Sequence, residues 1–165
     1  MADFLACSFT GHRHIKEAHK ENIKLLVFRA VEYAYSRGCR DFFSGGAVGF
    51  DTITAQEVLA FRDSHSDVRL CLLLPCENQD EHWSSVDKAV YRRILSSADS
   101  VEYVCKVYTP TCMRERNLKL AERADILISY VSRWSSGSAQ TVRMAERLGK
   151  EVYNLYPKLD AESGF

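Results

Sequence analysis

Short apolar runs alternate along this chain with longer segments of helical periodicity, and that alternation constrains the fold more than any other feature. Each run is bounded by loop-forming residues, which is typical of strands that are buried on both faces of a parallel sheet. The clearest helical segment places apolar residues on one face from Ile23 to Ala34 and ends at Arg37-Gly38. The sequence therefore predicts an α/β fold in which right-handed crossovers build one doubly wound, mainly parallel, Rossmann-like sheet flanked by helices.

The expected strands and helices cover most of the chain. A length of 165 residues suits one buried core and is short for two ordinary domains, so we expect a single domain over 1–165. The segment after Pro157 is polar and short, and we expect it to be frayed. The predicted strands are 4–9, 41–43, 68–74, 101–105, 126–130 and 152–155, and the further helices are 54–62, 85–97, 114–123 and 139–148.

The charge balance argues against binding that is driven by overall charge. The 22 basic residues are matched by 22 acidic residues, so neither nucleic acid nor an anionic membrane attracts the chain as a whole. No apolar run approaches the roughly 18 residues of a membrane-spanning helix, and no basic leader precedes the first apolar stretch. We therefore expect a cytoplasmic protein with no membrane partner, and we do not expect it to bind nucleic acid.

The cysteines predict neither a metal site nor a disulfide framework. The six cysteines are scattered, without a Cys-x-x-Cys pair or a histidine at zinc-ligand spacing. Cys76 and Cys112 lie in predicted loops, where they could be exposed, but no base adjoins either in sequence. We interpret both as incidental loop residues in preference to nucleophiles, and we expect no metal and no required cofactor.

Ligands of open α/β sheets bind at the carboxyl ends of the strands, so the residues that follow each predicted strand are candidates for a site. After the first strand, Gly11 allows close approach of the backbone and Arg13 offers a guanidinium suited to phosphate. His12 or His14 can hydrogen-bond a ligand or transfer a proton. A solvated turn into a helix is the alternative, and we favour ligand contact because the loop is cationic.

The segment 44–51 after the second strand holds glycines at positions 45, 46 and 49 and runs directly into a predicted helix. Backbone amides of such a loop and the helix N-terminus can converge on an anion. The pattern is neither the dinucleotide fingerprint Gly-x-Gly-x-x-Gly nor a P-loop, because the closing Gly-Lys-Ser/Thr is absent. Asp51 is equally well a helix N-cap or a group that binds a ribose hydroxyl or acts as a base.

Two further loops complete the candidate site. After the third strand, Asn78 and Gln79 carry amides suited to the edge of a base, and Trp83 can stack on a base or pack in the core. After the fifth strand, hydroxyl residues surround Gly137 where the last long helix begins. That arrangement suits a phosphate, and it has more hydroxyl groups than a serine N-cap requires.

Taken together, these segments resemble the SLOG superfamily, named for the Smf (DprA) and LOG proteins, and look most like its YpsA-like branch. The resemblance rests on segments 8–13, 44–51, 74–79, 108–117 and 137–141, whose order and spacing are more specific than any one motif. It implies a Rossmann-like sheet, frequent dimerisation and a pocket for a nucleotide or a related molecule.

The LOG proteins also imply a chemistry, from which this chain departs at one point. LOG enzymes hydrolyse the N-glycosidic bond of a nucleoside monophosphate, using an arginine of a Glu-Arg-Lys segment and a glutamate after a glycine-rich turn. The segment 115–117 matches the first motif, which implies that Arg116 contacts the phosphate or the leaving group. Thr141 stands about where the glutamate is expected, and a threonine cannot stabilise a developing oxocarbenium ion as a carboxylate does. Asp51 and Glu77 are the carboxylates that could substitute.

Two hypotheses about function follow. Phosphate-binding loops without the LOG glutamate favour a nucleotide-binding sensor or sequestering protein, for an adenine nucleotide, ADP-ribose or a related signalling molecule. The alternative is an N-glycosidase (phosphoribohydrolase) or ribosyl-transfer enzyme with Asp51 and Arg116 as catalytic residues. DprA-like binding of single-stranded DNA is less favoured, because no basic stripe with interleaved aromatic residues is evident.

The expected partners are a small nucleotide-like ligand and further copies of the chain, as a homodimer or higher homo-oligomer. The candidate ligand-binding residues are Thr10, Gly11, His12, Arg13, Ser44, Gly45, Gly46, Ala47, Gly49, Phe50, Pro75, Asn78, Gln79, Arg116, Asn117, Ser136, Gly137, Ser138, Ala139 and Thr141.

Overall fold

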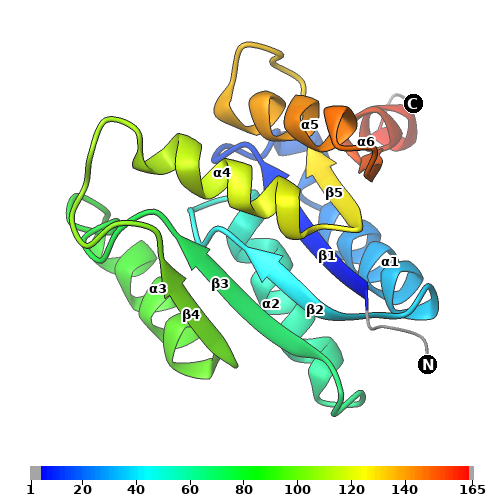
Figure 1. Ribbon diagram of the computed structural model, residues 1–165. Coiled ribbons are helices and arrows are strands. Elements are labelled where there is room, and N and C mark those ends of the chain that lie inside the picture. The colour runs from blue at the N-terminus through cyan, green and yellow to red at the C-terminus, as the bar shows by residue number, and fades with distance from the viewer. Residues whose placement is uncertain (1–4, 164–165) are drawn as a thin grey trace.

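A six-stranded sheet runs through the molecule, with helices packed on both faces (Figure 1). The structure is a computed structural model that describes residues 5–163, and its strands lie in the order β4-β3-β2-β1-β5-β6 with every adjacent pair parallel. The predicted α/β fold with one doubly wound, Rossmann-like sheet is therefore confirmed. The strands are β1 (Leu5–Gly11), β2 (Cys39–Ser44), β3 (Arg69–Leu74), β4 (Ser100–Tyr103), β5 (Ile126–Tyr130) and β6 (Glu151–Asn154). The helices are α1 (Ile23–Ser36), α2 (Phe50–Arg62), α3 (Ser85–Ser97), α4 (Cys112–Arg123), α5 (Gly137–Arg147) and α6 (Tyr156–Ser163), with a short 3-10 helix η1 (Glu17–His19) before α1.

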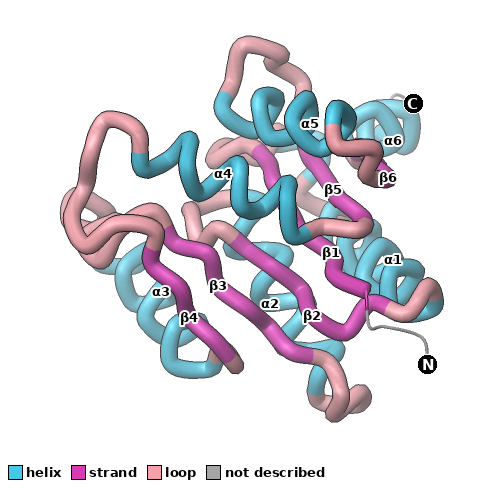
Figure 2. Tube along the Cα trace, in the orientation of Figure 1, coloured by secondary structure: helices cyan, strands magenta, loops and turns pink. Residues whose placement is uncertain are grey.

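Helices α1, α2 and α3 cover one face of the sheet, and α4 and α5 cover the other (Figure 2). Successive side chains of a strand point to opposite faces, so one strand can contribute to the cores on both sides of the sheet. In β5, Ile126 and Ile128 pack into the larger core, whereas Leu127 packs into the smaller core beneath α4 and α5. The predicted apolar face of α1, from Ile23 to Ala34, is buried in the larger core.

The predicted burial of strands on both faces fails at the two edges of the sheet. β4 and β6 each have one neighbouring strand, and most residues of β4 are exposed. β4 also ends at Tyr103, which leaves Cys105 in the loop that follows and not in the strand. An apolar run does not distinguish an edge strand from a central one, because the position of a strand in the sheet depends on the topology.

The C-terminal segment is helical, so the prediction that it is frayed after Pro157 is wrong within the described residues. The Nδ1 atom of His19 lies 2.6 Å from the Tyr130 hydroxyl, and its Nε2 atom lies 2.5 Å from Asp160 Oδ1 on α6. Leu159 of the same helix is buried in the larger core. These tertiary contacts, which the polar composition of the segment does not reveal, order α6 against η1.

Several boundaries and exposures differ from the sequence-based expectations. Strand β1 extends to Gly11, and the predicted residue Phe4 lies outside the described residues. Cys76 and Cys112 are 1% and 0% exposed, so the expectation that they could be exposed is wrong. Over residues 5–163 no helix is both long and apolar enough to cross a membrane, and no cluster of ligating side chains is placed to hold a metal ion.

Candidate functional site

A cavity of 290 Å³ opens beside the carboxyl end of the central strand β1. The strand order reverses at β1, because β2 adjoins it on one side and β5 on the other. Such a reversal leaves a crevice between loops that depart toward opposite faces of the sheet. We call this space the first cavity. It is lined by Thr10, Gly11, His12, Arg13, Ala47, Asp51, Met113, Arg116, Asn117, Leu120, Arg133, Ser136, Gly137 and Ser138.

Asp51 brings a buried carboxylate to the first cavity. It follows Phe50 in the first turn of α2, and Gly49 occupies the N-cap position, which excludes the N-cap interpretation of Asp51. Its Oδ2 atom accepts a hydrogen bond from the Ala47 amide at 3.2 Å, whereas its Oδ1 atom has no partner among the described residues. Burial raises the pKa of Asp51 to about 6, and the nearby charge of Arg116 opposes that shift. The cavity wall thus contains a carboxylate with a free acceptor atom.

Arg116 of α4 lies beside this carboxylate and is itself buried. Its Nη1 atom donates to the Gly45 carbonyl at 2.6 Å, and its Nε atom donates to Asn117 Oδ1 at 2.9 Å. Burial lowers the pKa of Arg116, and the Asp51 carboxylate acts in the opposite direction. A β-carbon at Gly45 would lie 2.9 Å from Asp51 Oδ2 and would overlap the guanidinium of Arg116. Gly45 therefore makes room for the approach of these two ionisable side chains.

The loops after β1 and β2 are packed directly against each other. Gly49 has a φ of +85°, and a β-carbon there would overlap the carbonyl oxygen of Arg13. A β-carbon at Gly11 would overlap the ring of Phe50, whose amide donates to the His12 carbonyl at 3.1 Å. These glycines therefore serve close packing of the two loops, which fixes Arg13 and His12 relative to α2.

His12 holds the loop between β5 and α5 against the first cavity. Its Nε2 atom accepts hydrogen bonds from the amides of Ser132 and Arg133, at 2.8 and 3.3 Å. A ring nitrogen that accepts is unprotonated, so the proton of the neutral ring lies on Nδ1. Burial, and then the charge of Arg133, lowers the pKa of His12. His12 therefore lines the cavity and also orders the loop that carries Arg133.

Helix α5 presents its N-terminus to the first cavity. Ser136 is its N-cap, since Ser136 Oγ accepts from the Ala139 amide at 3.1 Å and donates to the Arg133 carbonyl at 2.7 Å. The next residues, Gly137 and Ser138, line the cavity in the first turn, where backbone amides have no partner within the helix. An ordinary serine cap is therefore present, and the two residues that follow it belong to the cavity wall.

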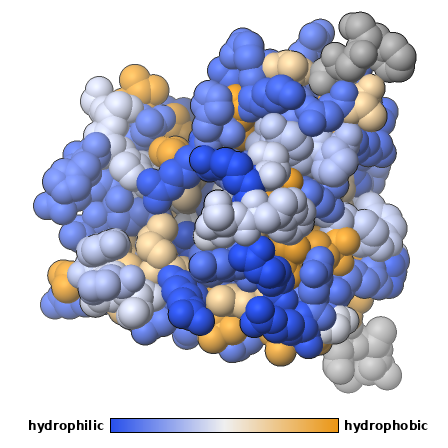
Figure 3. All heavy atoms as spheres, turned by 90° about the horizontal axis from the view of Figure 1, so that it is seen from above, coloured by the Kyte–Doolittle hydropathy of each residue, from blue (hydrophilic) through white to orange (hydrophobic). Residues whose placement is uncertain are grey.

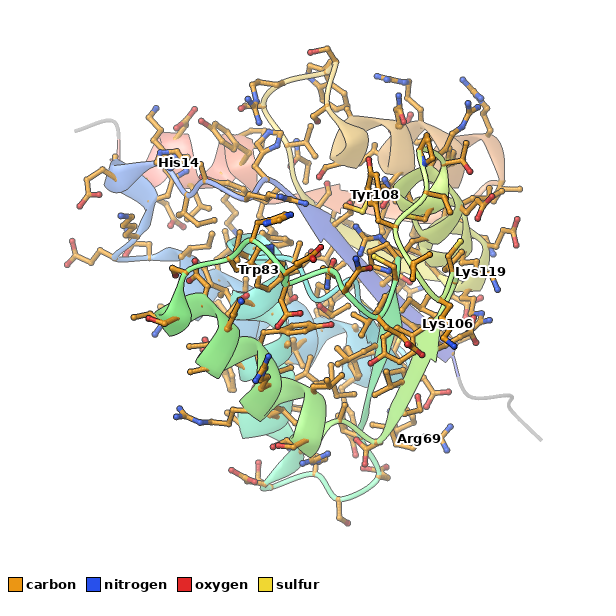
Figure 4. The ribbon with its side chains drawn as sticks, turned by 90° about the vertical axis from the view of Figure 1, so that its left-hand side faces the viewer. His14, Arg69, Trp83, Lys106, Tyr108 and Lys119 are labelled. Atoms are coloured by element: carbon orange, nitrogen blue, oxygen red, sulfur yellow. The ribbon has the colours of Figure 1, made fainter. Side chains whose placement is uncertain are left out.

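A second cavity, of 630 Å³, adjoins the first. Arg13 and Met113 line both, so the two spaces are neighbours. The second cavity lies among the loops that follow β3 and β4, and Figure 4 shows Trp83 beside the start of α3 and Tyr108 near the same end of the sheet. Its lining residues are Arg13, Pro75, Cys76, Asn78, Gln79, Glu81, His82, Trp83, Tyr108 and Met113.

The amide side chains of the second cavity also tie its loops together. Asn78 Oδ1 accepts from the Tyr108 amide at 3.1 Å, and Asn78 Nδ2 lies 3.3 Å from Glu81 Oε2. Gln79 Nε2 donates to the Gly46 carbonyl at 3.5 Å. Both amides proposed to contact a base therefore donate within the protein, and Gln79 Oε1 is left without a partner among the described residues.

Several candidate residues support the wall from behind. Ser44 Oγ donates to the Asp51 carbonyl at 3.1 Å, and Thr141 Oγ1 donates to the Gly137 carbonyl at 3.1 Å within α5. Ala139 packs in the smaller core. The candidates that line neither cavity are Ser44, Gly45, Gly46, Gly49, Phe50, Ala139 and Thr141.

The sequence-based candidates missed Leu120 and Arg133, which line the first cavity; Met113 also lines it, whereas from the sequence it was equally a pocket wall or a dimer-interface residue. Arg133 lies between β5 and the N-terminus of α5, so its place after a strand at the reversal of strand order was a usable signal. Met113 and Leu120 face the cavity from α4 with helical spacing, and nothing in the sequence separates them from residues that face the core.

The chain matches the sequence profile of the YpsA (YspA SLOG) family over residues 9–156. It is 24% identical over 135 residues to the SPbeta prophage-derived protein YoqJ of Bacillus subtilis, and this match covers 73% of this chain and 79% of that protein. It is 27% identical over 123 residues to a UPF0398 protein of Halalkalibacterium halodurans, and this match covers 73% of this chain and 61% of that relative.

In three dimensions the chain is similar to DNA processing protein A (DprA) of Streptococcus pneumoniae, with a TM-score of 0.67 and 17% identity over 92% of this chain and 50% of that chain. The DprA of Helicobacter pylori, whose solved structure addresses its single-stranded DNA binding mode, has a TM-score of 0.64 and 20% identity over 90% of this chain and 63% of that chain. These similarities show the fold. Because the family profile covers most of the sequence, the chain belongs to the YspA SLOG family.

Proposed function

We propose that the chain binds a phosphate-bearing nucleotide, or a signalling molecule derived from one, as a sensor or sequestering protein. The observation that carries the proposal is the buried Asp51 carboxylate in the wall of the first cavity, whose Oδ1 atom has no partner among the described residues. A buried acceptor without a partner costs about 1–3 kcal/mol, and a ligand hydroxyl that donates to it would remove that cost. A ribose hydroxyl is a donor of this kind.

The remaining polar wall of the first cavity favours an anion. Arg13 and Arg133 line it, and no carboxylate within the described residues forms an ion pair with either. The first turn of α5 adds amides and the positive end of a helix dipole. An adenine nucleotide or ADP-ribose would therefore place a phosphate between these arginines and α5, with a ribose hydroxyl against Asp51.

The second cavity is where we place the rest of such a ligand. It continues from the first past Arg13 and Met113, and it contains Trp83 and Tyr108 as aromatic surfaces. Trp83 packs edge-on against Tyr91 of the larger core, with the two ring centroids 5.1 Å apart, and this contact restricts the orientation of its ring. A base could stack here at little conformational cost, because such rings have few rotatable bonds.

N-glycosidic bond hydrolysis is the second candidate, and one observation favours it. Asp51 lies in the same cavity as Arg116, and burial raises its pKa to about 6, within the range of carboxyl groups that transfer protons. Thr141 gives no help, because its hydroxyl is committed to the Gly137 carbonyl inside α5. An enzyme would therefore depend on Asp51, and the Asp51→Asn variant would abolish release of base.

The experiment that tests the proposal is mass spectrometry of any ligand released from purified protein, together with AMP, ADP and ADP-ribose tested for thermal stabilisation and for base release. A ligand at 100 times its Kd stabilises the folded state by about 2.7 kcal/mol, which is a measurable rise in Tm. Stabilisation without turnover supports a sensor, and release of base supports the enzyme. Absence of a released ligand together with no stabilisation by any of the three would contradict both.

We also propose that the protein is a homodimer or higher homo-oligomer, as the family resemblance implied. Light scattering coupled to size exclusion gives the mass in solution directly. A mass near the 18.8 kDa of one chain would contradict this part of the proposal.

A further inference from the structure

Three arginine side chains line one hollow of 240 Å³ where α4 and α5 meet the surface. Arg114 comes from α4, and Arg143 and Arg147 come from α5, with Gln140 and Met144 completing the lining. The α5 residues are spaced as one stripe of a helix, so their side chains lie side by side. We call this space the arginine hollow. The upper face of the molecule in Figure 1, which carries α5, is mainly hydrophilic in Figure 3.

The arginines of this hollow are not balanced by carboxylates. No ion pair of the described residues involves Arg114, Arg143 or Arg147, and no acidic residue lines the hollow. Six other arginines form ion pairs with carboxylates, whereas Arg29 and Arg93, like Arg13 and Arg133, form none among the described residues. Those pairs are Arg37–Glu151, Arg40–Asp67, Arg62–Asp99, Arg69–Asp41, Arg92–Asp80 and Arg123–Glu102.

One of these guanidinium groups is held in place by the protein. Arg143 Nη1 donates to the Trp134 carbonyl at 2.8 Å, which anchors it between α5 and the loop that precedes the helix. Like charges gathered at one place repel each other, and a multivalent anion would relieve that repulsion. Guanidinium groups form paired hydrogen bonds with phosphate oxygens, and Gln140 adds a further donor.

We propose that the arginine hollow is a second anion site, separate from the first cavity, that binds closely spaced phosphate groups. Free polyphosphate and the backbone of single-stranded nucleic acid both present that chemistry. The balanced net charge of the chain led to the expectation that nucleic acid is not a ligand, but net charge does not report a local cluster of one sign. The two sites share no lining residue, although both use α4 and α5.

The test uses the full chain and two probes, inorganic tripolyphosphate by calorimetry and a fluorescein-labelled 20-nucleotide oligothymidylate by anisotropy. The variant carries Arg114→Gln, Arg143→Gln and Arg147→Gln, and Arg93→Gln, on the opposite face in α3, is the matched control. We expect the triple variant to bind whichever probe the wild type binds more tightly with at least about tenfold lower affinity. The Arg93→Gln control should bind that probe with the wild-type affinity. For the oligonucleotide, loss of up to three phosphate contacts should reduce the slope of log K against log salt by about 2.

Each outcome has a definite meaning. Loss of oligonucleotide binding assigns the hollow to nucleic acid, and loss of tripolyphosphate binding alone assigns it to free polyphosphate. Binding of neither probe by the wild type, or equal binding by the triple variant, overturns the proposal. Arg13→Gln separates the two sites, because it should weaken binding of AMP in the first cavity and leave the tripolyphosphate affinity unchanged. If Arg13→Gln removes tripolyphosphate binding and the triple variant does not, the polyanion occupies the first cavity and the proposal is wrong.

Discussion

The Asp51→Asn variant replaces the buried carboxylate of the first cavity with an amide of nearly the same size, which resembles the protonated acid. The pKa of Asp51 in the folded chain is about 6, against an ordinary value of 3.8. The folded state therefore holds this proton more tightly than the unfolded state. The associated stability is fully present below pH 3.8 and is lost as the pH rises through about 6. At neutral pH, Asp51 lowers the free energy of unfolding.

The size of the effect follows from the two pKa values. The difference between about 6 and 3.8 corresponds to ~3 kcal/mol, at about 1.36 kcal/mol for each pKa unit. The attraction of Arg116 is already contained in that figure, because it opposes the shift. For a chain of this length, ~3 kcal/mol corresponds to a rise in Tm of about 6–12 °C. We expect Asp51→Asn to unfold at higher urea concentration than the wild type at pH 7.5, with the difference shrinking toward zero near pH 4.

The matched control is Asp63→Asn, at the exposed C-terminal end of the same helix, α2. It should change the free energy of unfolding by less than about 0.5 kcal/mol, as surface substitutions usually do. A destabilised Asp51→Asn variant at pH 7.5, or a stabilisation that does not vary with pH, would refute the reasoning, because the effect depends on the charge of the carboxylate.

Three further predictions concern stability. The pKa of His12 is lowered in the folded state, so its contribution to stability is present above about pH 6.5 and is lost as the pH falls through its folded-state pKa. The difference in free energy of unfolding between wild type and His12→Gln, measured by urea unfolding, should therefore be larger at pH 8 than at pH 5. Gly45→Ala should destabilise the fold by about 1–3 kcal/mol, because the added methyl group overlaps the Arg116 guanidinium. Gly137→Ala is the control and should not destabilise it, because the nearest atom of another residue would lie 3.5 Å from its β-carbon. Thermal unfolding compares the two variants, and equal Tm values would contradict the packing argument. Leu159→Ala should cost about 2–5 kcal/mol and expose α6 to limited proteolysis; wild-type resistance would show that the helix does not depend on this contact.

The layered parallel sheet could be predicted from the sequence because it depends on local patterns. The apolar stripe from Ile23 to Ala34 and the uniformly apolar segment of β5 carry the helical and buried-strand signals in their own residues. The ordering of α6 could not be predicted in this way. It depends on contacts of Asp160 with His19 and of Leu159 with the core, which join segments far apart in the sequence.

The candidate site shows the same division. The rule that ligands bind beyond the carboxyl ends of strands brought Arg13, His12 and Asp51 to one cavity correctly, since that rule follows from topology. The roles of individual glycines did not follow from the sequence. Gly45 makes room for two ionisable side chains, and Gly49 makes room for a neighbouring carbonyl, which only the packed loops reveal.

Calorimetric titration of AMP and ADP-ribose into the wild type and into Asp51→Asn tests the proposed nucleotide site most directly. We expect at least one of the two to bind the wild type, and the variant to bind it about tenfold more weakly, which is about 1.4 kcal/mol for a charge-assisted hydrogen bond replaced by a neutral one. Because Asp51→Asn should be more stable than the wild type at pH 7.5, weaker binding by the variant at that pH could not be attributed to unfolding. Failure of both nucleotides to bind the wild type, or equal affinity for the two proteins, would contradict a nucleotide site built around Asp51.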